Sequence, residues 1–185
     1  MRIIGIAGPA GAGKDTVADH LALAYRFERM AFADPIYRGL AAILDMPEWR
    51  LRRRDLKERA IPEIGRSPRE LLQTLGTEWG RELVREDIWL VLAGLELEKA
   101  RLRAAPGVAI TDVRFDNEAR FVRAAGGQIW HIQRPGITAV RAHASEAGVW
   151  PADVDRGIYN DGTLQELAAR VDKLLMKTQT EKGVA

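Results

Sequence analysis

The chain has 185 residues, of which 46% are hydrophobic and 29% charged, and its formal net charge is +2. This length predicts one domain with a sizeable core, and the small net charge argues against nucleic-acid binding despite a sequence pI near 9.1. No apolar run approaches the roughly 20 residues of a membrane span, no signal peptide precedes the first strand, and cysteine is absent, so we expect a cytoplasmic protein without membrane contacts, disulfides or thiolate metal sites.

A buried strand at residues 3–7 is the first predicted element, and the glycine-rich stretch GPAGAGKDT at residues 8–16 follows it directly. Two glycines separated by four residues and followed by lysine match a phosphate-binding loop, in which backbone N–H groups and the next helix N-terminus hold phosphate oxygens. Apolar residues at helical spacing from residue 17 onward predict that helix. The residues that we expect to bind a nucleotide here are Gly8, Gly11, Ala12, Gly13, Lys14, Asp15 and Thr16.

The residue after the lysine departs from the usual loop. A Ser or Thr hydroxyl at that position ordinarily contacts Mg²⁺, but this chain has Asp15, and Thr16 follows it. Either Asp15 meets the metal, directly or through water, or Thr16 takes over that role. The sequence leaves both alternatives open.

A highly charged, helical region is predicted from Asp34 to about residue 89, after a second short strand within residues 27–32. Inside it, the stretch from Ser67 to Glu70 has the signature of a helix start, with a proline in the first turn and a capping box. The most basic run, residues 50–59, is interrupted by acidic residues and lacks interleaved aromatic residues. We therefore interpret this run as a solvated helix face rather than a nucleic-acid site.

The rest of the chain alternates helices and strands. Helices are predicted at residues 88–103, from a cap at Asp116 to a stop at Gly126, and from 164 onward, where Thr163 and Glu166 form a capping box. Strands are predicted at residues 108–112, 128–132 and 156–159.

This alternation predicts an α/β fold with a parallel sheet covered by helices on both faces. In such sheets the ligand lies beyond the carboxyl ends of the strands. The candidate residues that follow predicted strands should therefore meet at one rim, and they are Gly8–Lys14, Asp34, Asp112–Arg114, Arg134 and Asn160–Gly162.

Four stretches carry a resemblance to a known family: GPAGAGKDT, SPRELLQTLGTEWGR, ITDVRFDNEA and YNDGTLQEL. Together with HIQRPG and HASE they cover nearly the whole chain in order. The chain resembles the bacteriophage-type deoxynucleoside monophosphate kinases of the P-loop nucleoside monophosphate kinase superfamily. The loop specifies only the superfamily, whereas the second and third stretches together are typical of a much smaller group of proteins within it.

The resemblance implies ATP- and Mg²⁺-dependent phosphorylation of deoxynucleoside 5′-monophosphates, in the host cytoplasm if the chain is encoded by a phage. It also implies one P-loop kinase domain over residues 1–176 with a five-stranded parallel core at residues 1–33 and 104–176. An acceptor-binding helical insertion would occupy about 34–90, a short lid about 134–150 and a flexible tail 177–185. A homodimer is a further expectation from the resemblance.

Several charged residues are candidates for the transfer step, because phosphoryl transfer needs positioning and positive charge more than covalent chemistry. Lys14 would reach the outer phosphates of the nucleotide, and Asp112 would hold Mg²⁺ or one of its waters. Arg114 could grip the acceptor phosphate, and Arg134 and Arg141 could neutralise the moving group. The plain alternatives are a turn or capping aspartate, a salt bridge from Arg114 to Asp116 or Glu118, and surface charge.

The acceptor side is expected mainly in the helical region. Arg69 and Gln73 lie one helical turn apart, so an arginine for the acceptor phosphate and an amide for the base would share a face, which Thr77 and Arg81 continue. Trp79 could stack on a base, although core packing is the expected role on this helix. The remaining candidates come from the resemblance and are Asp34, Lys57, His143, Ser145 and Glu146.

The turn formed by Asn160, Asp161 and Gly162 would provide a backbone wall beside the adenine, as in related kinases, while also capping the last helix. Two other functions compete. One is a different small P-loop kinase, acting on dephospho-coenzyme A or phosphomevalonate, which should lack the Gln73 to Arg81 arrangement. The other is a nucleotide-binding regulator or a nucleic-acid-linked ATPase.

Overall fold

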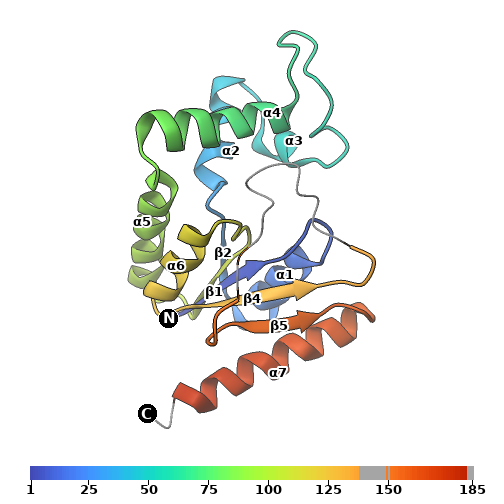
Figure 1. Ribbon diagram of the computed structural model, residues 1–185, viewed down its shortest axis with the longest axis vertical. Coiled ribbons are helices and arrows are strands. Elements are labelled where there is room, and N and C mark those ends of the chain that lie inside the picture. The colour runs from blue at the N-terminus through green and yellow to red at the C-terminus, as the bar shows by residue number, and fades with distance from the viewer. Residues whose placement is uncertain (138–148, 150, 183–185) are drawn as a thin grey trace. The chain divides into compact units, whose positions relative to one another are not determined.

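The computed structural model describes residues 1–137, 149 and 151–182. The chain forms two compact units (Figure 1). Residues 1–31 with 97–185 make the sheet unit, and residues 32–96 make the helical unit.

The sheet unit contains a five-stranded sheet in the order β2-β3-β1-β4-β5, and every neighbouring pair is parallel. This confirms the α/β fold with a five-stranded parallel sheet. The strands are β1 (Arg2–Ala7), β2 (Glu28–Met30), β3 (Gly107–Ile110), β4 (Gln128–Gln133) and β5 (Arg156–Tyr159). The helices of this unit are α1 (Lys14–Tyr25), the end of α5 (Ile88–Leu102), α6 (Asp116–Ala124) and α7 (Leu164–Lys182).

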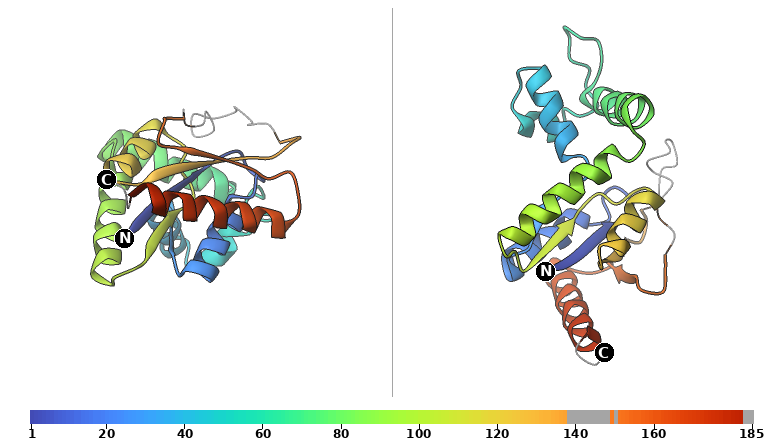
Figure 2. Two further views of the ribbon diagram at one scale, coloured as in Figure 1. Left: turned by 90° about the horizontal axis from the view of Figure 1, so that it is seen from below. Right: turned by 90° about the vertical axis from the view of Figure 1, so that its left-hand side faces the viewer.

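Alternation along the strands sends apolar side chains to both faces of the sheet. On one face, Ile4 and Ile6 of β1 join the cluster that α1 and α7 cover (Figure 2). On the other face, Gly5 leaves room for α6, because a Cβ at Gly5 would lie 3.3 Å from a Val122 methyl. The first strand is thus buried on both sides and fixes the loop that follows it.

The helical unit is built from α2 (Asp34–Ile43), α3 (Glu48–Arg52), α4 (Pro68–Gln73), η1 (Thr74–Val84) and the start of α5 (Ile88–Leu102). Its small core centres on Tyr37, Leu40 and Leu51. The predicted capping box of α4 is confirmed, since the Glu70 amide donates to Ser67 Oγ and the Ser67 amide donates to Glu70 Oε2 at 2.8 Å.

Three local predictions need correction. Asp116 is the first residue of α6 and not its cap; instead Glu118 Oε2 accepts from the amides of Arg114 and Phe115 at 2.8 and 3.1 Å. The helix after Ser67 does not stay α-helical, because η1 is a π-helix, in which each N–H bonds to the carbonyl five residues back. The last helix continues past Met176 to Lys182.

Within the described residues, no helix combines the length and the apolar character that a membrane span requires.

Candidate active site

The loop between β1 and α1 has a backbone that requires glycine. Gly8 and Gly13 have φ of 142° and 107°, in the region that L side chains rarely adopt. A Cβ at Gly8 would collide with the carbonyl oxygen of Ile132, and one at Gly13 would lie 2.5 Å from Asn160 Nδ2. The loop is therefore pressed against β4 and the end of β5, and it leads straight into the N-terminus of α1 at Lys14.

Lys14 folds back over this loop. Its Nζ donates to the carbonyls of Gly8 and Pro9 at 2.8 and 2.9 Å. Burial lowers the pKa of the Lys14 ammonium and the positive charge of Arg114 lowers it further, whereas Asp15 and Asp112 act in the opposite direction. These effects place the charges of Asp112 and Arg114 close to Lys14.

Asp15 and Thr16 differ in their surroundings. The Asp15 carboxylate accepts from Arg29 of β2 at 3.0 Å, and Arg29 also pairs with Asp19. Asp15 is largely exposed, and Thr16 is half-buried. The Asp15 carboxylate thus already forms a salt bridge with Arg29 of β2.

Asn160, which follows β5, forms a hydrogen bond with the glycine-rich loop. It is buried, and its Nδ2 donates to the carbonyl of Ala12 at 2.8 Å while its own amide donates to the carbonyl of Gln133 at 2.7 Å. The predicted capping box of α7 exists, because the Glu166 amide donates to Thr163 Oγ1 and the Thr163 amide donates to Glu166 Oε2 at 2.7 Å, whereas the segment from Asn160 to Gly162 contains a bend and not the predicted turn. The side chain of Asn160, however, is used for loop geometry, a role that the sequence did not suggest.

Three predicted site residues lie beside the loop in the sheet unit. Asp112 follows β3, and Arg134 follows β4, where its Nη1 donates to the carbonyl of Gly11 at 3.4 Å. Arg114 is exposed, and no carboxylate of the described residues forms a salt bridge with its guanidinium; Glu118 bonds to its backbone instead. The structure thus brings Lys14, Asp112, Arg114 and Arg134 together around one loop.

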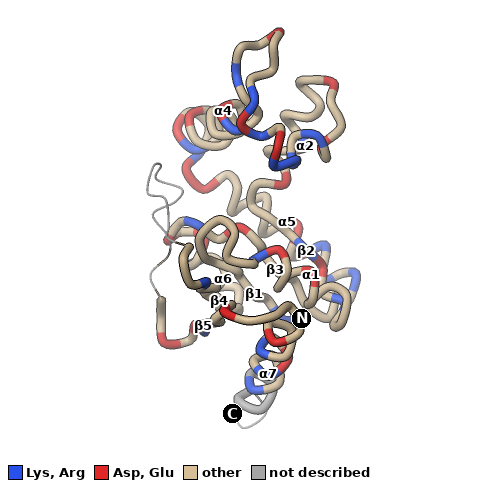
Figure 3. Tube along the Cα trace, turned by 90° about the vertical axis from the view of Figure 1, so that its right-hand side faces the viewer, with Lys and Arg blue, Asp and Glu red and all other residues tan. Residues whose placement is uncertain are grey.

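In the helical unit, several predicted acceptor residues have partners. Asp34 accepts from Arg52 at 2.7 Å, Lys57 Nζ donates to the Tyr37 hydroxyl at 2.7 Å, and Arg69 pairs with Glu58. Basic and acidic positions are interspersed through this unit (Figure 3), including the 50–59 run, where Arg53 pairs with Asp55. These pairs are consistent with the solvated face predicted for that run.

The remaining helical candidates lie on or next to η1. Gln73, Thr77 and Arg81 are half-buried. Trp79 is 45% exposed, so the expectation that it packs in the core is wrong. The buried indole belongs to Trp89, which sequence reasoning missed; the pair of glycines four residues apart at Gly76 and Gly80 was the available signal that a large ring lies against this helix.

Four candidates, Arg141, His143, Ser145 and Glu146, lie outside the described residues, as does most of the expected lid. Among the residues that are described, no group of three or more His, Asp or Glu side chains could hold a metal by itself. A magnesium ion that serves phosphoryl transfer needs only one or two carboxylates, because waters and phosphates complete its shell. Asp112 beside Lys14 fits that requirement.

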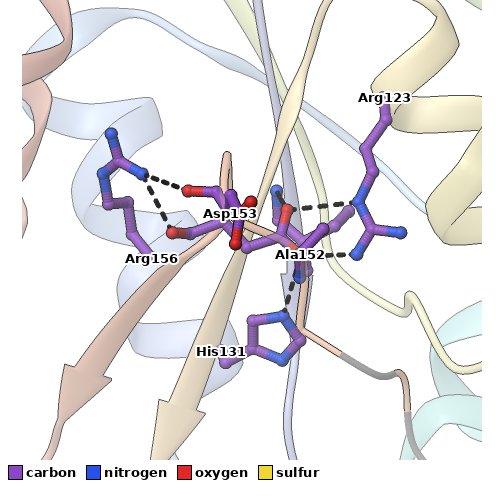
Figure 4. A network of polar contacts seen from close by, with 7 residues as sticks. Arg123, His131, Ala152, Asp153 and Arg156 are labelled. Carbon is purple, nitrogen blue, oxygen red and sulfur yellow. Dashed lines mark hydrogen bonds and ion pairs between the residues drawn. The ribbon is translucent and has the colours of Figure 1, made fainter.

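A buried carboxylate stabilises the end of the sheet remote from the loop. The Asp155 side chain is 1% exposed and accepts from Arg123 of α6 at 2.5 Å, from the amides of Ala152 and Ile129 at 2.9 and 3.1 Å, and lies 3.3 Å from His131 Nε2 (Figure 4). Burial alone would raise the pKa of Asp155, but Arg123 and the other donors outweigh it and hold the pKa at about 2.

The fold and the loop define the class of protein, a P-loop kinase. Solved structures with a similar fold include a sugar kinase from a Janibacter species (TM-score 0.54, 16% identity, 95% of this chain and 94% of that one). Another is the dephospho-CoA kinase of Campylobacter jejuni (TM-score 0.52, 12% identity, 98% of this chain and 100% of that one).

The family is narrower than this class. The model of the deoxynucleotide monophosphate kinase family matches residues 58–171, more than half of the chain, and the chain belongs to this family. A putative deoxynucleotide monophosphate kinase of Acanthamoeba polyphaga mimivirus is 28% identical over 92% of this chain and 94% of its own length. The deoxynucleoside-5′-monophosphate kinase of Escherichia phage T5 is 47% identical over 36% of this chain, but that match spans only 26% of the phage protein.

Proposed function

We propose that this chain transfers the γ-phosphoryl group of ATP to the 5′-phosphate of a deoxynucleoside monophosphate. A phosphate oxygen of the acceptor forms a bond to the γ-phosphorus, the bond from that phosphorus to the β-phosphate oxygen breaks, and ADP and the deoxynucleoside diphosphate leave. One observation carries the proposal: in a member of this family, a glycine loop runs from a buried strand into the N-terminus of α1, and the cations of Lys14 and Arg134 both reach carbonyl groups of that loop.

The donor half is assigned to the sheet unit. The loop amides and the N-terminus of α1 would bind the phosphates of ATP. Lys14 now donates to two loop carbonyls, and on nucleotide binding its ammonium would exchange these for phosphate oxygens. The segment Asn160–Gly162 would lie beside the adenine, and the Asn160 amide would keep the loop in its binding shape.

Asp112 and Thr16 are the residues that we assign to Mg²⁺. Asp112 is the carboxylate beside Lys14 that follows a central strand, and Thr16 is favoured over Asp15 because Arg29 already engages the Asp15 carboxylate. When bound, Mg²⁺ would screen the negative charge of the phosphates. Arg114 and Arg134 would bring further positive charge to the transferring group.

Acceptor binding is assigned to residues of the helical unit. Arg69 would exchange its pair with Glu58 for the acceptor phosphate, and the amide of Gln73 would read base edges. Thr77 and Arg81 continue this stripe, and the exposed Trp79 is available for stacking. We also expect the enzyme to act in the cytoplasm, where both nucleotides are found, and to be able to form a homodimer.

The test is a coupled assay of ADP release with each of the four common deoxynucleoside monophosphates, ATP and Mg²⁺. At least one acceptor should stimulate ADP formation strongly, and Lys14→Ala should abolish it. Stimulation by dephospho-coenzyme A or phosphomevalonate alone would favour a different small kinase. Stimulation by DNA alone would favour an ATPase, and no acceptor-dependent ADP with any monophosphate would refute the proposal.

A further inference from the structure

The helical unit contains an unusually close contact between Trp89 and the π-helix η1. The indole is 5% exposed, and its Nε1 donates to the carbonyl of Gly76 at 2.8 Å. A Cβ at Gly80 would clash with the six-membered ring and lie 2.9 Å from Trp89 Cε2, so only glycine allows the ring to approach at this point. The ring thus reaches two glycines one turn apart.

This contact coincides with a change in the helix. Residues Pro68–Gln73 form an α-helix, and from Thr74 to Val84 the chain continues as a π-helix, which closes where the Arg85 amide donates to the carbonyl of Gly80 at 2.9 Å. π-Helical turns are rare and occur frequently at functional sites. A carbonyl oxygen has two lone pairs, so Gly76 can accept from the indole as well as from its own helix.

The widened helix bears the candidate acceptor residues. Thr77 and Arg81 directly follow the two glycines, and Gln73 is the last residue before η1 begins. All three are half-buried, whereas Glu78 and Trp79 are exposed, and Thr77 and Arg81 are the chain neighbours of the two glycines that the indole contacts. A return of this segment to α-helical hydrogen bonding would shift the three side chains relative to one another.

We propose that Trp89 is a positioning residue for the acceptor monophosphate: its contact with Gly76 and Gly80 maintains the wide helix and thereby sets the spacing of Gln73, Thr77 and Arg81. The inference rests on the proposed function for the last three residues. Trp89 itself touches no substrate in this account, and its effect reaches the acceptor only through η1.

The first test compares two Trp→Phe variants. Trp89→Phe keeps an aromatic ring but removes the N–H that bonds Gly76. Trp130→Phe is the matched control, because the Trp130 indole is fully buried in the sheet unit and its Nε1 has no hydrogen-bond partner among the described residues. Loss of one buried hydrogen bond should raise the KM for the best deoxynucleoside monophosphate about five- to tenfold in Trp89→Phe, with the KM for ATP unchanged. The control should leave both values within about twofold.

The second test separates positioning from stability. In the Trp89→Phe background the smaller ring removes the clash with the indole, while a Cβ at residue 80 keeps a 3.1 Å approach to the Leu75 carbonyl oxygen. The higher helix propensity of alanine offsets this approach, so Gly80→Ala should leave the melting temperature of Trp89→Phe unchanged or higher. It should not restore the acceptor KM. In the wild-type background Gly80→Ala should push the ring away and raise the acceptor KM by itself. If Trp89→Phe fails to fold, Gly80→Ala in the wild-type background still tests the inference, because it changes the glycine side of the same contact.

The outcomes are distinct. Suppose that the wild type is active and that the Trp89→Phe or the Gly80→Ala variant folds. Normal binding of the monophosphate by that variant in a calorimetric titration would then overturn this inference and leave the proposed function intact. Recovery of the acceptor KM together with stability in the double variant would also overturn it, because Trp89 would then be a purely structural residue. A wild type that phosphorylates none of the monophosphates would instead overturn the proposed function, and this inference with it.

Discussion

Replacing Asp155 by asparagine should make the protein less stable at neutral pH, and the difference should shrink in acid. The variant keeps the size of the side chain and one acceptor oxygen, and it removes the negative charge that faces Arg123 and two backbone amides. A protonated aspartic acid closely resembles asparagine. The variant therefore mimics the state that the wild type reaches only when the Asp155 carboxylate takes up a proton.

The magnitude follows from the pKa of Asp155, which is about 2 in the folded protein against an ordinary value of 3.8. Each pKa unit corresponds to about 1.4 kcal/mol, so the ionised carboxylate contributes roughly 2 kcal/mol. Because the folded pKa is lowered, this stability is present above the unfolded pKa and is lost as the pH falls from about 4 to about 2. About half should be gone by pH 3.

Urea unfolding followed by tryptophan fluorescence at pH 7, 5, 4 and 3 would measure this. We expect the free energy of unfolding of Asp155→Asn to lie roughly 2 kcal/mol below that of the wild type at pH 7, and the gap to narrow by pH 3. Asp153→Asn is the control, because that side chain is exposed, and it should show no gap. A gap that is absent at pH 7, or equal at pH 7 and pH 3, would refute the argument.

Two further predictions concern the loop and the acceptor phosphate. Asn160→Asp should raise the KM for ATP by tenfold or more over the wild type, because a carboxylate oxygen would face the carbonyl oxygen of Ala12. Asn160→Ala should raise this KM less. Equal KM values for all three proteins would contradict this prediction. Arg114→Ala should lower kcat/KM for the acceptor by a hundredfold or more, since the Arg114 guanidinium forms no salt bridge with a described carboxylate. Arg53→Ala is the control: it loses an exposed pair with Asp55, and its kcat/KM should stay within about twofold of the wild-type value. A large effect of Arg53→Ala with none from Arg114→Ala would reverse the assignment.

The parts of the fold that the sequence predicts are those that depend on local signals. A strand, a glycine loop and a helix start adjoin one another around Lys14, and the Ser67 and Thr163 caps need only the residue three positions further on. Such patterns survive tertiary packing because each is satisfied within one segment.

Contacts between distant segments were not predictable in this way. Nothing near Asn160 in the sequence shows that its side chain reaches Ala12, which lies 148 residues away. Asp155 resembles any turn aspartate until Arg123 is placed beside it. Trp79 and Trp89 lie on consecutive helices, and the close approach of Trp89 to Gly80, which buries the Trp89 indole, is visible only in the folded chain.

The central claim is that the glycine loop and Lys14 deliver a phosphoryl group to a monophosphate and not to water. Incubation with ATP that carries a radioactive γ-phosphate, followed by chromatography of the products, tests it most directly. We expect label in the β-position of the deoxynucleoside diphosphate, equal amounts of diphosphate and ADP, and no transfer by Lys14→Ala. Label recovered only as inorganic phosphate, with every deoxynucleoside monophosphate unchanged, would contradict it.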